Sequence, residues 1–366
     1  MKTVTLSEFK THLIQGLPVI DVRAPVEFEQ GSIPGSVNLP VLSDQERHEV
    51  GLCYKTQGQE AAIALGYRIV SGKNLEIKTQ NWLSYIQSHP EALITCFRGG
   101  LRSQTSQKFI ASHGVDVPRL EKGYKQARAF FLETIANYAE QASLVILTGN
   151  TGSAKTHVLN ALAEDVPVVD LEGLAHHRGS AFGAWDIPQP VQADFENRLA
   201  VKLLSLQQPS LIMLEDESRM IGHRHIPEVF FTKMRASPVI LMNESLEQRI
   251  DNIYIDYISS KLNQSSEPTA VSRVLESYRE SIRKIKNKLG GLRAQELLSD
   301  MDLCEQQFFT SGGLEKNKIW IEKLLVWYYD PMYVGSLEKR EPKIQFKGSR
   351  LEVMDYIKSL KIVTKA

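Results

Sequence analysis

Residues 94–104, ITCFRGGLRSQ, place a cysteine at the end of an apolar run and follow it with two glycines and two arginines. Residues 92–95 predict a short buried strand, and residues 103–112 predict a helix. In α/β proteins, functional sites form where parallel strands end and helices begin. Cys96 lies at such a point and is therefore our first candidate for a functional residue.

The loop that follows Cys96 has features that favour a sulfur anion. Gly99 and Gly100 allow unusual backbone dihedrals, so that successive amides can turn toward the sulfur. Arg98 and Arg102 add full positive charges, and the next helix adds its positive end. These effects favour the thiolate and would also hold an anionic substrate against it. Packing in the core is the usual role of a free cysteine, but this setting predicts a catalytic nucleophile.

The first third of the chain alternates between strand-like and helix-like patterns. Strands are expected at residues 17–22 and 37–39, and helices at 58–69 and 82–88. Such alternation predicts an α/β domain with a parallel sheet that is covered by helices on both faces. Cys96 would then lie at the carboxyl edge of that sheet.

Composition excludes several classes of protein. The 366 residues suffice for two domains, and the 43 basic and 43 acidic residues balance, so only a local basic patch could bind nucleic acid. The three cysteines lie far apart, which argues against a disulfide framework. Cys53 and Cys304 are expected to be buried packing residues. No signal peptide and no window of roughly 20 apolar residues is found, so we expect a cytoplasmic protein without membrane contact.

A second anion-binding pattern lies in the middle of the chain. Residues 144–147, LVIL, predict a strand, and the next segment, GNTGSAKT, matches the phosphate loop G-x-x-x-x-G-K-[ST] except at Ala154. Such loops surround a di- or triphosphate with amides and supply a lysine and a magnesium-binding hydroxyl. Ala154 is harmless if its backbone is helical and disruptive if the position needs a positive φ. The candidate diphosphate-binding residues are Gly149, Gly152, Lys155 and Thr156.

Further strands of this second domain are expected at residues 166–170, 211–214 and 238–242. Acidic residues follow the second of these strands, at the place where phosphate-loop folds hold magnesium. Two arginines in polar clusters are suited to bind an anion. We expect no dedicated metal site. The candidates for magnesium or substrate contacts are Glu215, Asp216, Arg178 and Arg219.

The last third of the chain is predicted to be helical. Residues 271–293 contain seven basic and two acidic residues, a local excess that suggests contact with a phosphate backbone. Residues 319–333, IWIEKLLVWYYDPMY, gather several aromatic side chains. Such a cluster more often belongs to the core than to a base-stacking platform.

The first domain resembles the rhodanese-like domain. The resemblance rests on residues 21–40, DVRAPVEFEQGSIPGSVNLP, and on CFRGGLRSQ in the cysteine loop. It implies that Asp21 and Arg23 form a structural ion pair. The C-x5-R spacing from Cys96 to Arg102 also occurs in cysteine phosphatases built on this fold. The loop therefore leaves sulfur transfer and phosphate-ester hydrolysis open.

A rhodanese-like domain followed by a phosphate-loop domain resembles the tRNA 2-selenouridine synthase family. LEGLAHHRGSAFG, LEDESRMIG and YYDPMY also resemble that family's landmarks. We expect an α/β chain with a rhodanese-like parallel-sheet domain at residues 1–128 and a connecting helix at 129–143. Residues 144–366 would form a P-loop NTPase-like domain with a helical C-terminal portion.

This resemblance implies that sulfur is replaced by selenium in 2-thiouridine at the tRNA wobble position, U34. Selenophosphate would donate selenium, and geranyl diphosphate would form an S-geranyl-2-thiouridine intermediate. Cys96 would act in the selenium step, and the phosphate loop would bind the diphosphate. Expected partners are tRNA and a selenophosphate-supplying enzyme, with no tightly bound cofactor and with Mg²⁺ assisting.

Two alternatives belong to other classes. One is a rhodanese-fold cysteine phosphatase or sulfurtransferase with a nucleotide-binding P-loop domain. The other is a nonenzymatic scaffold with degenerate loops, for which Ala154 is the best argument. Hydrolysis of an aryl phosphate would favour the first, and failure to modify thiolated tRNA would favour the second.

Overall fold

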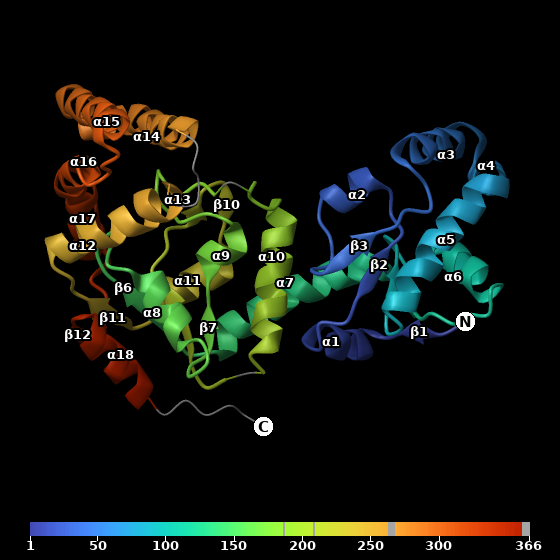
Figure 1. Ribbon diagram of the computed structural model, residues 1–366. Coiled ribbons are helices and arrows are strands. Elements are labelled where there is room, and N and C mark those ends of the chain that lie inside the picture. The colour runs from blue at the N-terminus through green and yellow to red at the C-terminus, as the bar shows by residue number, and fades with distance from the viewer. Residues whose placement is uncertain (186, 208, 263–267, 361–366) are drawn as a thin grey trace. The chain divides into compact units, whose positions relative to one another are not determined.

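The computed structural model divides into two compact units (Figure 1). The described residues are 1–185, 187–207, 209–262 and 268–360. Unit 1 comprises Met1–Tyr138 and Pro190–Gln207, and unit 2 comprises Ala139–Gln189 and Gln208–Ala366. In the described part of the chain, no helix has the length and apolarity needed to cross a bilayer.

Unit 1 is built on a five-stranded parallel sheet with the strand order β1-β5-β4-β2-β3. Parallel neighbours need crossover connections, which the helices supply. The strands are β1 (Thr3–Val4), β2 (Val19–Asp21), β3 (Ser36–Asn38), β4 (Leu93–Thr95) and β5 (Arg119–Leu120). The helices are α1 (Leu6–Ile14), α2 (Pro25–Glu29), α3 (Asp44–Gln57), α4 (Gln59–Ile69), α5 (Gly72–Ser88), α6 (Leu101–Ala111), α7 (Gly123–Gln141) and α10 (Gln192–Ser205).

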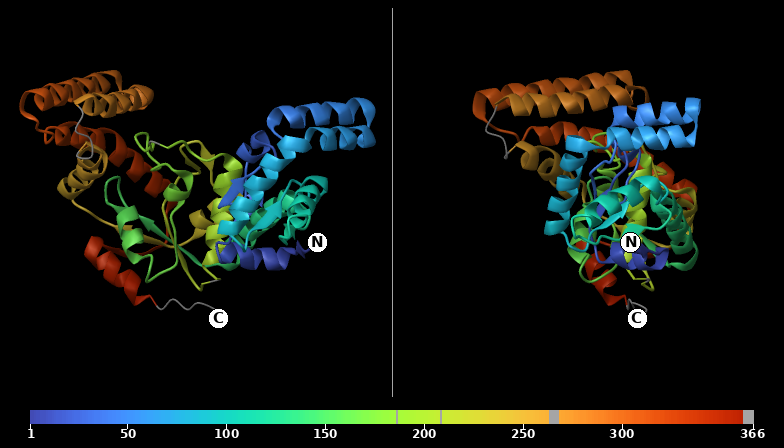
Figure 2. Two further views of the ribbon diagram at one scale, coloured as in Figure 1. Left: turned by 45° about the vertical axis from the view of Figure 1, so that its right-hand side comes forward. Right: turned by 90° about the vertical axis from the view of Figure 1, so that its right-hand side faces the viewer.

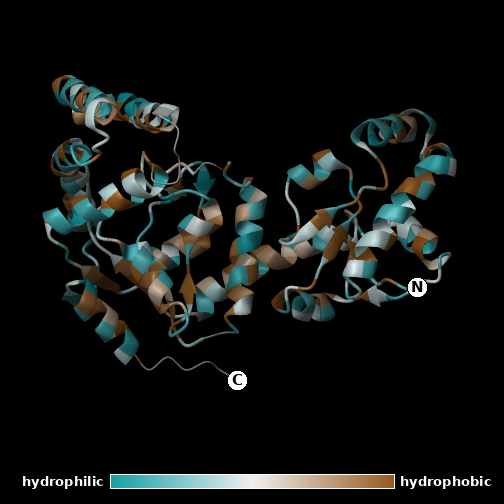
Figure 3. Ribbon diagram, viewed as in Figure 1, coloured by the Kyte–Doolittle hydropathy of each residue, from teal (hydrophilic) through white to brown (hydrophobic). Residues whose placement is uncertain are grey.

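The core of unit 1 lies on both faces of this sheet. Ile94 and Cys96 belong to the apolar cluster that contains Trp82 of α5. Outside that cluster, the rings of Phe9 in α1 and Phe131 in α7 lie 6.4 Å apart, and both side chains are fully buried. Figure 3 shows the strands as the hydrophobic centre and the helices as mixed in hydropathy. The expected parallel sheet with helices on both faces is confirmed.

Helix α10 belongs to unit 1, although the sequence analysis placed its residues in the second domain. It packs against α1 and buries Phe195, Leu199 and Leu203. The amide of Asn197 donates to the carbonyl of Ser32 at 2.7 Å. Residues so distant in sequence meet only through tertiary packing. The local sequence pattern therefore did not reveal that α10 belongs to unit 1.

Unit 2 is also built on a five-stranded parallel sheet, with the order β12-β11-β6-β8-β7. Strand β6 leads into the phosphate loop and pairs directly with β8, where Leu147 is opposite Glu215. The carboxyl ends of these two strands are therefore neighbours. The strands are β6 (Leu144–Thr148), β7 (Val168–Val169), β8 (Ile212–Glu215), β11 (Val239–Met242) and β12 (Ile344–Gly348), and β9 (Met220–Ile221) and β10 (Arg224–His225) form a separate antiparallel pair.

The helices of unit 2 form two groups. Those around the sheet are α8 (Lys155–Leu162), α9 (Leu171–Ala175), α11 (Glu228–Ala236) and α18 (Arg350–Ser359). Those of the helical portion are α12 (Leu246–Ile253), α13 (Ser260–Leu262), α14 (Pro268–Leu289), α15 (Gly291–Ser311), α16 (Asn317–Leu324) and α17 (Asp330–Arg340). Helices α14 and α15 lie side by side in both views of Figure 2. The helical C-terminal portion is confirmed, but strand β12 was not predicted.

Each group in unit 2 has its own core. Val145 and Leu147 of β6 pack with α8 and α18, whereas Tyr278, Leu297 and Trp320 belong to the core of the helical portion. Two π-helical segments, Tyr254–Ser259 and Leu325–Tyr329, interrupt that portion. Such segments are rare and often occur at functional sites.

Candidate active sites in the two units

Cys96 directly follows strand β4 in unit 1, as predicted. Its side chain is only 3% exposed, and its thiol donates to the hydroxyl of Ser103 at 3.2 Å. Ser103 lies in the first turn of α6, so the sulfur is at the amino-terminal end of that helix. The helix dipole there favours a negative charge. The sulfur is thus buried, but at a place suited to an anion.

The shape of the cysteine loop depends on Gly99. This residue has φ of +63°, and a side-chain carbon there would lie 2.7 Å from the amide of Lys122 and 2.8 Å from the carbonyl of Leu120. The guanidinium of Arg119 donates to the carbonyl of Gly99 at 2.6 Å. Only glycine combines this dihedral with such close backbone packing.

Backbone amides from outside the cysteine loop donate hydrogen bonds to two of its carbonyls. The amides of Tyr124 and Lys125, near the start of α7, donate to the carbonyls of Cys96 and Phe97, each at 2.9 Å. Among the described residues, no carbonyl accepts from the backbone amides of residues 98–102. Such free amides beside a helix amino terminus are suited to bind an anion.

The two arginines of the loop have different surroundings. Arg102 donates to both carboxylate oxygens of Glu27, one at 3.1 Å, and Arg47 also pairs with Glu27. Partial burial acts to raise the pKa of Glu27, but the hydrogen bonds and charges of these arginines lower it. The charge of Arg102 still acts on Cys96, while Arg98 is exposed to solvent. Both arginines were expected to add positive charge at the sulfur, but Glu27 pairs with Arg102 and was not predicted.

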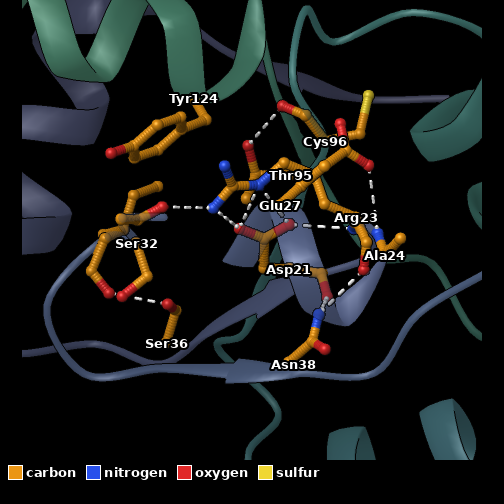
Figure 4. A network of polar contacts seen from close by, with 12 residues as sticks. Asp21, Arg23, Ala24, Glu27, Ser32, Ser36, Asn38, Thr95, Cys96 and Tyr124 are labelled. Carbon is orange, nitrogen blue, oxygen red and sulfur yellow. Dashed lines mark hydrogen bonds and ion pairs between the residues drawn. The ribbon is translucent and has the colours of Figure 1, made fainter. Parts of the chain in front are cut away.

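Asp21 and Arg23 form a buried ion pair, as the resemblance implied (Figure 4). The Nε of Arg23 donates to Asp21 at 2.8 Å, and an Nη donates to the carbonyl of Gly31 at 2.7 Å. The guanidinium carbon lies 4.0 Å from the ring centre of Tyr124. Figure 4 shows the Cys96 sulfur directed away from this pair, which therefore braces the fold near the loop.

The phosphate loop of unit 2 is held by helix α12. Arg249 donates to the carbonyl of Thr151 at 2.9 Å, and Asn252 donates to the carbonyl of Gly152 at 2.9 Å. Gly152 has φ of +83°, and a side-chain carbon there would lie 2.8 Å from the carbonyl of Arg249. Because α12 engages these carbonyls, the loop amides remain for a phosphate group.

Asp330 supports the same loop and was not predicted. It pairs with Arg249 at 2.6 Å and accepts from the side chain of Asn150 at 2.9 Å. Asp330 belongs to the YYDPMY segment, which the sequence analysis singled out for its aromatic residues and as a family landmark. No local pattern indicates its partners, because they lie far away in the sequence.

Lys155 and Thr156 begin helix α8 beside the loop. The ammonium group of Lys155 donates to the carbonyl of Gly149 at 2.8 Å. The hydroxyl of Thr156 lies 3.1 Å from a carboxylate oxygen of Glu215 and 3.3 Å from one of Glu172. The four predicted diphosphate-binding residues thus lie together beside an acidic group of side chains.

Three carboxylates form that acidic group. Oxygens of Glu172, Glu215 and Glu217 lie within 4.8 Å of one another, and Glu215 and Glu217 are buried. Burial, together with the charge of Glu172, raises the pKa of Glu215 to about 8, and burial also raises the pKa values of Glu172 and Glu217. One buried oxygen of Glu215 has no hydrogen-bond partner. This set of hard oxygen ligands fits Mg²⁺, although no dedicated metal site was expected.

Asp216 does not belong to this carboxylate group. It accepts from Thr148 at 2.6 Å and pairs with Arg340 at 2.6 Å. Successive residues of an extended chain point in opposite directions, so Glu215 and Glu217 share one side. Of the two carboxylates that the sequence favoured, only Glu215 joins the group. In the sequence Glu215-Asp216-Glu217, the two glutamates are two residues apart. This spacing was the signal that could have identified Glu217 as a member of the carboxylate group.

A cavity of about 670 Å³ connects these polar groups with the helical portion of unit 2. The phosphate loop and the carboxylates form one side. Both π-helical segments contribute to the other side, through Tyr257 and Tyr329. Burial raises the pKa of each of these phenols, so both are neutral. Further apolar lining comes from Phe182, Ile253, Trp320, Leu324 and Met332.

The two predicted arginines also line this cavity. The guanidinium carbon of Arg178 lies 4.8 Å from the ring centre of Tyr257, and one of its nitrogens donates to the carbonyl of Asp256 at 3.4 Å. Arg219 is more exposed and pairs with Glu228. Arg178 is therefore the better placed of the two to meet an anion in the cavity.

Comparisons with known proteins agree with both halves of the chain. A family model for the rhodanese-like domain matches residues 5–130, and one described as the tRNA 2-selenouridine synthase AAA domain matches residues 142–362. A tRNA 2-selenouridine synthase of Bdellovibrio bacteriovorus is 46% identical over 98% of this chain and 99% of its own. The chain belongs to the tRNA 2-selenouridine synthase family.

Other members of the family give the same result. The tRNA 2-selenouridine synthase of Nitrosomonas europaea is 44% identical over 98% of this chain and 99% of its own, and that of Cupriavidus necator is 41% identical over 96% and 97%. A solved N-terminal domain of an ATP/GTP-binding protein from Clostridium difficile 630 is 31% identical over 36% of this chain and 99% of its own, with a TM-score of 0.33. The full-length matches identify the chain as an enzyme of the synthase family.

The other two cysteines of this synthase are buried and free, as expected. Cys304 lies in the core of the helical portion, and burial raises the pKa of its thiol to about 11. Such a thiol is a weak nucleophile at neutral pH. The geometry thus agrees with a packing role for Cys304.

Ala154 has φ of +61° and ψ of +38°, so the phosphate loop does need a left-handed residue at this position. We expect Ala154→Gly to stabilise the synthase by about 1 kcal/mol and to raise its melting temperature by about 2–4 °C, since glycine tolerates this conformation. Thermal and urea denaturation would measure both changes.

The matched control for this prediction is Ala161→Gly in the exposed part of helix α8, which should destabilise by about 1 kcal/mol. Equal destabilisation by both glycines would show that position 154 has no left-handed strain.

Proposed function

We propose that the enzyme replaces sulfur by selenium in 2-thiouridine at the wobble position of tRNA, through an S-geranyl intermediate. Selenophosphate would donate selenium, and geranyl diphosphate would donate the geranyl group. The observation that carries the proposal is the unit 2 cavity, in which a phosphate loop meets an apolar, aromatic wall. Geranyl diphosphate has the same two halves, a diphosphate and a ten-carbon chain.

In the first step, the sulfur of 2-thiouridine attacks C1 of the geranyl group. A carbon–sulfur bond forms, the carbon–oxygen bond breaks, and pyrophosphate leaves with the electron pair. The base loses its N3 proton to solvent, which leaves a neutral S-geranylated base. Lys155 and the loop amides would stabilise the growing charge on the leaving group. The rings of Trp320, Tyr257 and Tyr329 line the cavity and would stabilise positive charge on the allylic carbon.

Magnesium would be held by Glu172, Glu215, Glu217 and Thr156, whose oxygens suit a hard cation. When bound, it would neutralise charge on the diphosphate. The unpartnered oxygen of Glu215 supports this assignment, because a buried carboxylate oxygen without a partner is unfavourable. The ammonium group of Lys155, which reaches the Gly149 carbonyl, would also bind the diphosphate.

Magnesium should bind more tightly as the pH rises from 6 toward 8. The pKa of Glu215 is about 8 in the free protein, so the ion must displace a proton at lower pH. If binding displaces one proton, the magnesium affinity should rise about tenfold for each pH unit below the pKa of Glu215. Above that pKa, the affinity should no longer change with pH. Isothermal titration in buffers of different ionisation enthalpy would measure the affinity and the protons released.

The control for this titration is Glu215→Gln, which should bind magnesium more weakly and with a shallower pH dependence. An affinity of the unaltered enzyme that stays constant between pH 6 and 8 would contradict the assignment of these carboxylates.

In the second step, selenium attacks C2 of the S-geranylated base. A carbon–selenium bond forms, the C2–sulfur bond breaks, and geranylthiol leaves after taking a proton. Water then cleaves the selenium–phosphorus bond and releases phosphate. The free amides of residues 98–102 would bind the phosphate of selenophosphate, and Cys96 would assist the transfer. The alternative phosphatase would use Arg102 to bind phosphate, but Arg102 is paired with Glu27.

The proposed substrate is tRNA, the substrate in the names of the relatives. Several cations on α14 and at the start of α15 are exposed and would contact its phosphate backbone. Arg279 is not among them, because it is buried and pairs with Glu305. A tRNA substrate would place the enzyme in the cytoplasm, near a selenophosphate-supplying enzyme. The exposed cations are Arg273, Arg283, Lys284, Lys286, Lys288 and Arg293.

The test uses the purified full chain, Mg²⁺ and thiolated tRNA, with nucleosides analysed by mass spectrometry. Geranyl diphosphate alone should yield S-geranyl-2-thiouridine, and both donors together should yield 2-selenouridine. Selenophosphate alone should leave the thiouridine unchanged. Formation of 2-selenouridine without geranyl diphosphate would overturn the geranyl intermediate, and no product with both donors would overturn the proposal.

A further inference from the structure

Unit 1 contains a cavity of about 680 Å³ between the helix pair α3–α4 and the start of α6. Leu101 and Arg102, which directly follow the cysteine loop, form part of its wall. Cations of α3, among them Arg47 and Lys55, also line it. Most of the remaining wall is apolar and includes Val41, Leu42, Val50, Ile63 and Val70. A volume of this size is typical of small-molecule sites.

Two glycines line this cavity, and Gly66 is the more buried of them. Gly51 lies inside α3 and Gly66 lies inside α4, and both residues line the cavity. A side-chain carbon added at either position would meet no atom within 4 Å. Glycine destabilises a helix interior relative to alanine. A helix pair that served only for packing would gain stability from larger residues here, so the empty space points to a ligand.

The walls of this cavity are continuous with the surroundings of Cys96. Val41, Leu42 and Val70 belong to the same buried apolar cluster as Cys96. At the other side of the loop, Arg102 contacts both Glu27 and the cavity. A ligand in the cavity would therefore place its polar end beside the anion-binding loop and its apolar end between α3 and α4.

We propose that this cavity binds the prenyl chain of the S-geranylated base during the selenium step. This inference rests on the proposed function and adds a site to it. Each unit has an anion-binding loop next to a cavity with an apolar wall. Such a pair is expected if one ten-carbon chain is attached in unit 2 and removed in unit 1.

The chemistry of the second step explains why such a cavity is needed. When the C2–sulfur bond breaks, the electron pair leaves with the sulfur, which takes a proton to become geranylthiol. This leaving group is largely apolar, so its exposure to water is unfavourable. A cavity that holds the chain also distinguishes the geranylated base from the unmodified thiolated base, which lacks the chain.

The test compares Gly66→Phe with Gly66→Ala in the full chain. The phenylalanine ring should block the part of the cavity beside α4, whereas the alanine methyl group is small and should improve the helix. Initial rates of selenation are measured with pre-formed S-geranyl and S-methyl tRNA anticodon stem-loops. With the S-geranyl substrate, Gly66→Phe should raise the KM about tenfold or more, and the smaller Gly66→Ala should raise it much less.

The S-methyl substrate provides the control within the experiment. Its short group does not reach into the cavity, so Gly66→Phe should leave its KM unchanged. An equal loss with both substrates would indicate a contact with RNA or a structural defect, and it would overturn the proposal. No loss with either substrate would also overturn it.

A binding measurement separates failure of this inference from failure of the proposed function. S-geranyl-2-thiouridine nucleoside is titrated into the full-length enzyme, Gly66→Phe and Gly66→Ala, and the number of nucleosides bound per chain is measured. One site that Gly66→Phe removes and Gly66→Ala retains would support the prenyl site even if geranyl diphosphate proved not to be a substrate. No binding, or the same number of sites in all three proteins, would overturn the prenyl site whatever unit 2 does.

Discussion

Lys155→Ala is expected to slow geranylation of thiolated tRNA by about 10²–10³-fold, the range found when one group that stabilises developing charge is removed. The ammonium group of Lys155 lies at the phosphate loop, 2.8 Å from the carbonyl of Gly149. It would face the oxygen that becomes negative as the carbon–oxygen bond breaks. Quenched single-turnover reactions with labelled geranyl diphosphate would measure the rate.

The same variant should still convert pre-geranylated tRNA into selenated tRNA, because that step is assigned to unit 1. Lys347→Ala, in the exposed part of strand β12, is a matched control that should retain both steps. Unchanged geranylation in Lys155→Ala would refute the diphosphate role of the loop. Loss of both steps would refute the division of the chemistry between the two units.

Cys96→Ala is expected to slow selenium incorporation by about 10²–10³-fold, because it removes the side chain that would assist the transfer beside the anion-binding loop. Geranylated tRNA should accumulate, since unit 2 remains intact. The sulfur contacts Ser103 in the first turn of α6, and the loop that follows Cys96 carries the free amides of residues 98–102. Mass spectrometry of nucleosides from single-turnover reactions would follow both the intermediate and the product.

The chain offers two matched controls for this prediction. Cys53→Ala and Cys304→Ala remove the other free, buried cysteines, and both variants should retain selenation. If Cys96→Ala selenates tRNA at the rate of these controls, Cys96 is a packing residue and the amides alone bind the anion. A stability measurement on all three variants separates loss of chemistry from loss of folding.

The local parts of both sites could be predicted from the sequence. Cys96 and its glycines lie within a few residues of one another, as do Gly149, Lys155 and Thr156. Strand–loop–helix units of this kind depend on nearby residues, so their apolar runs and glycines indicate both the fold class and the anion-binding loops. The parallel sheets and the order of the two domains followed from the same patterns.

The partners of those parts could not be predicted. Glu27 pairs with Arg102, Asp330 supports the phosphate loop, and Glu172 joins Glu215, although each lies far in sequence from its partner. The assignment of α10 to unit 1 and the two cavities also depend on packing between distant segments.

The sequence by itself therefore determined which backbone loops can bind anions, because a loop's dihedrals and free amides follow from residues next to one another. Only the tertiary structure decided which charged side chains pair, which carboxylates lie together and where the two cavities with apolar walls form. Ion pairing and burial depend on distances through space, and folding sets those distances among residues that the linear sequence keeps apart.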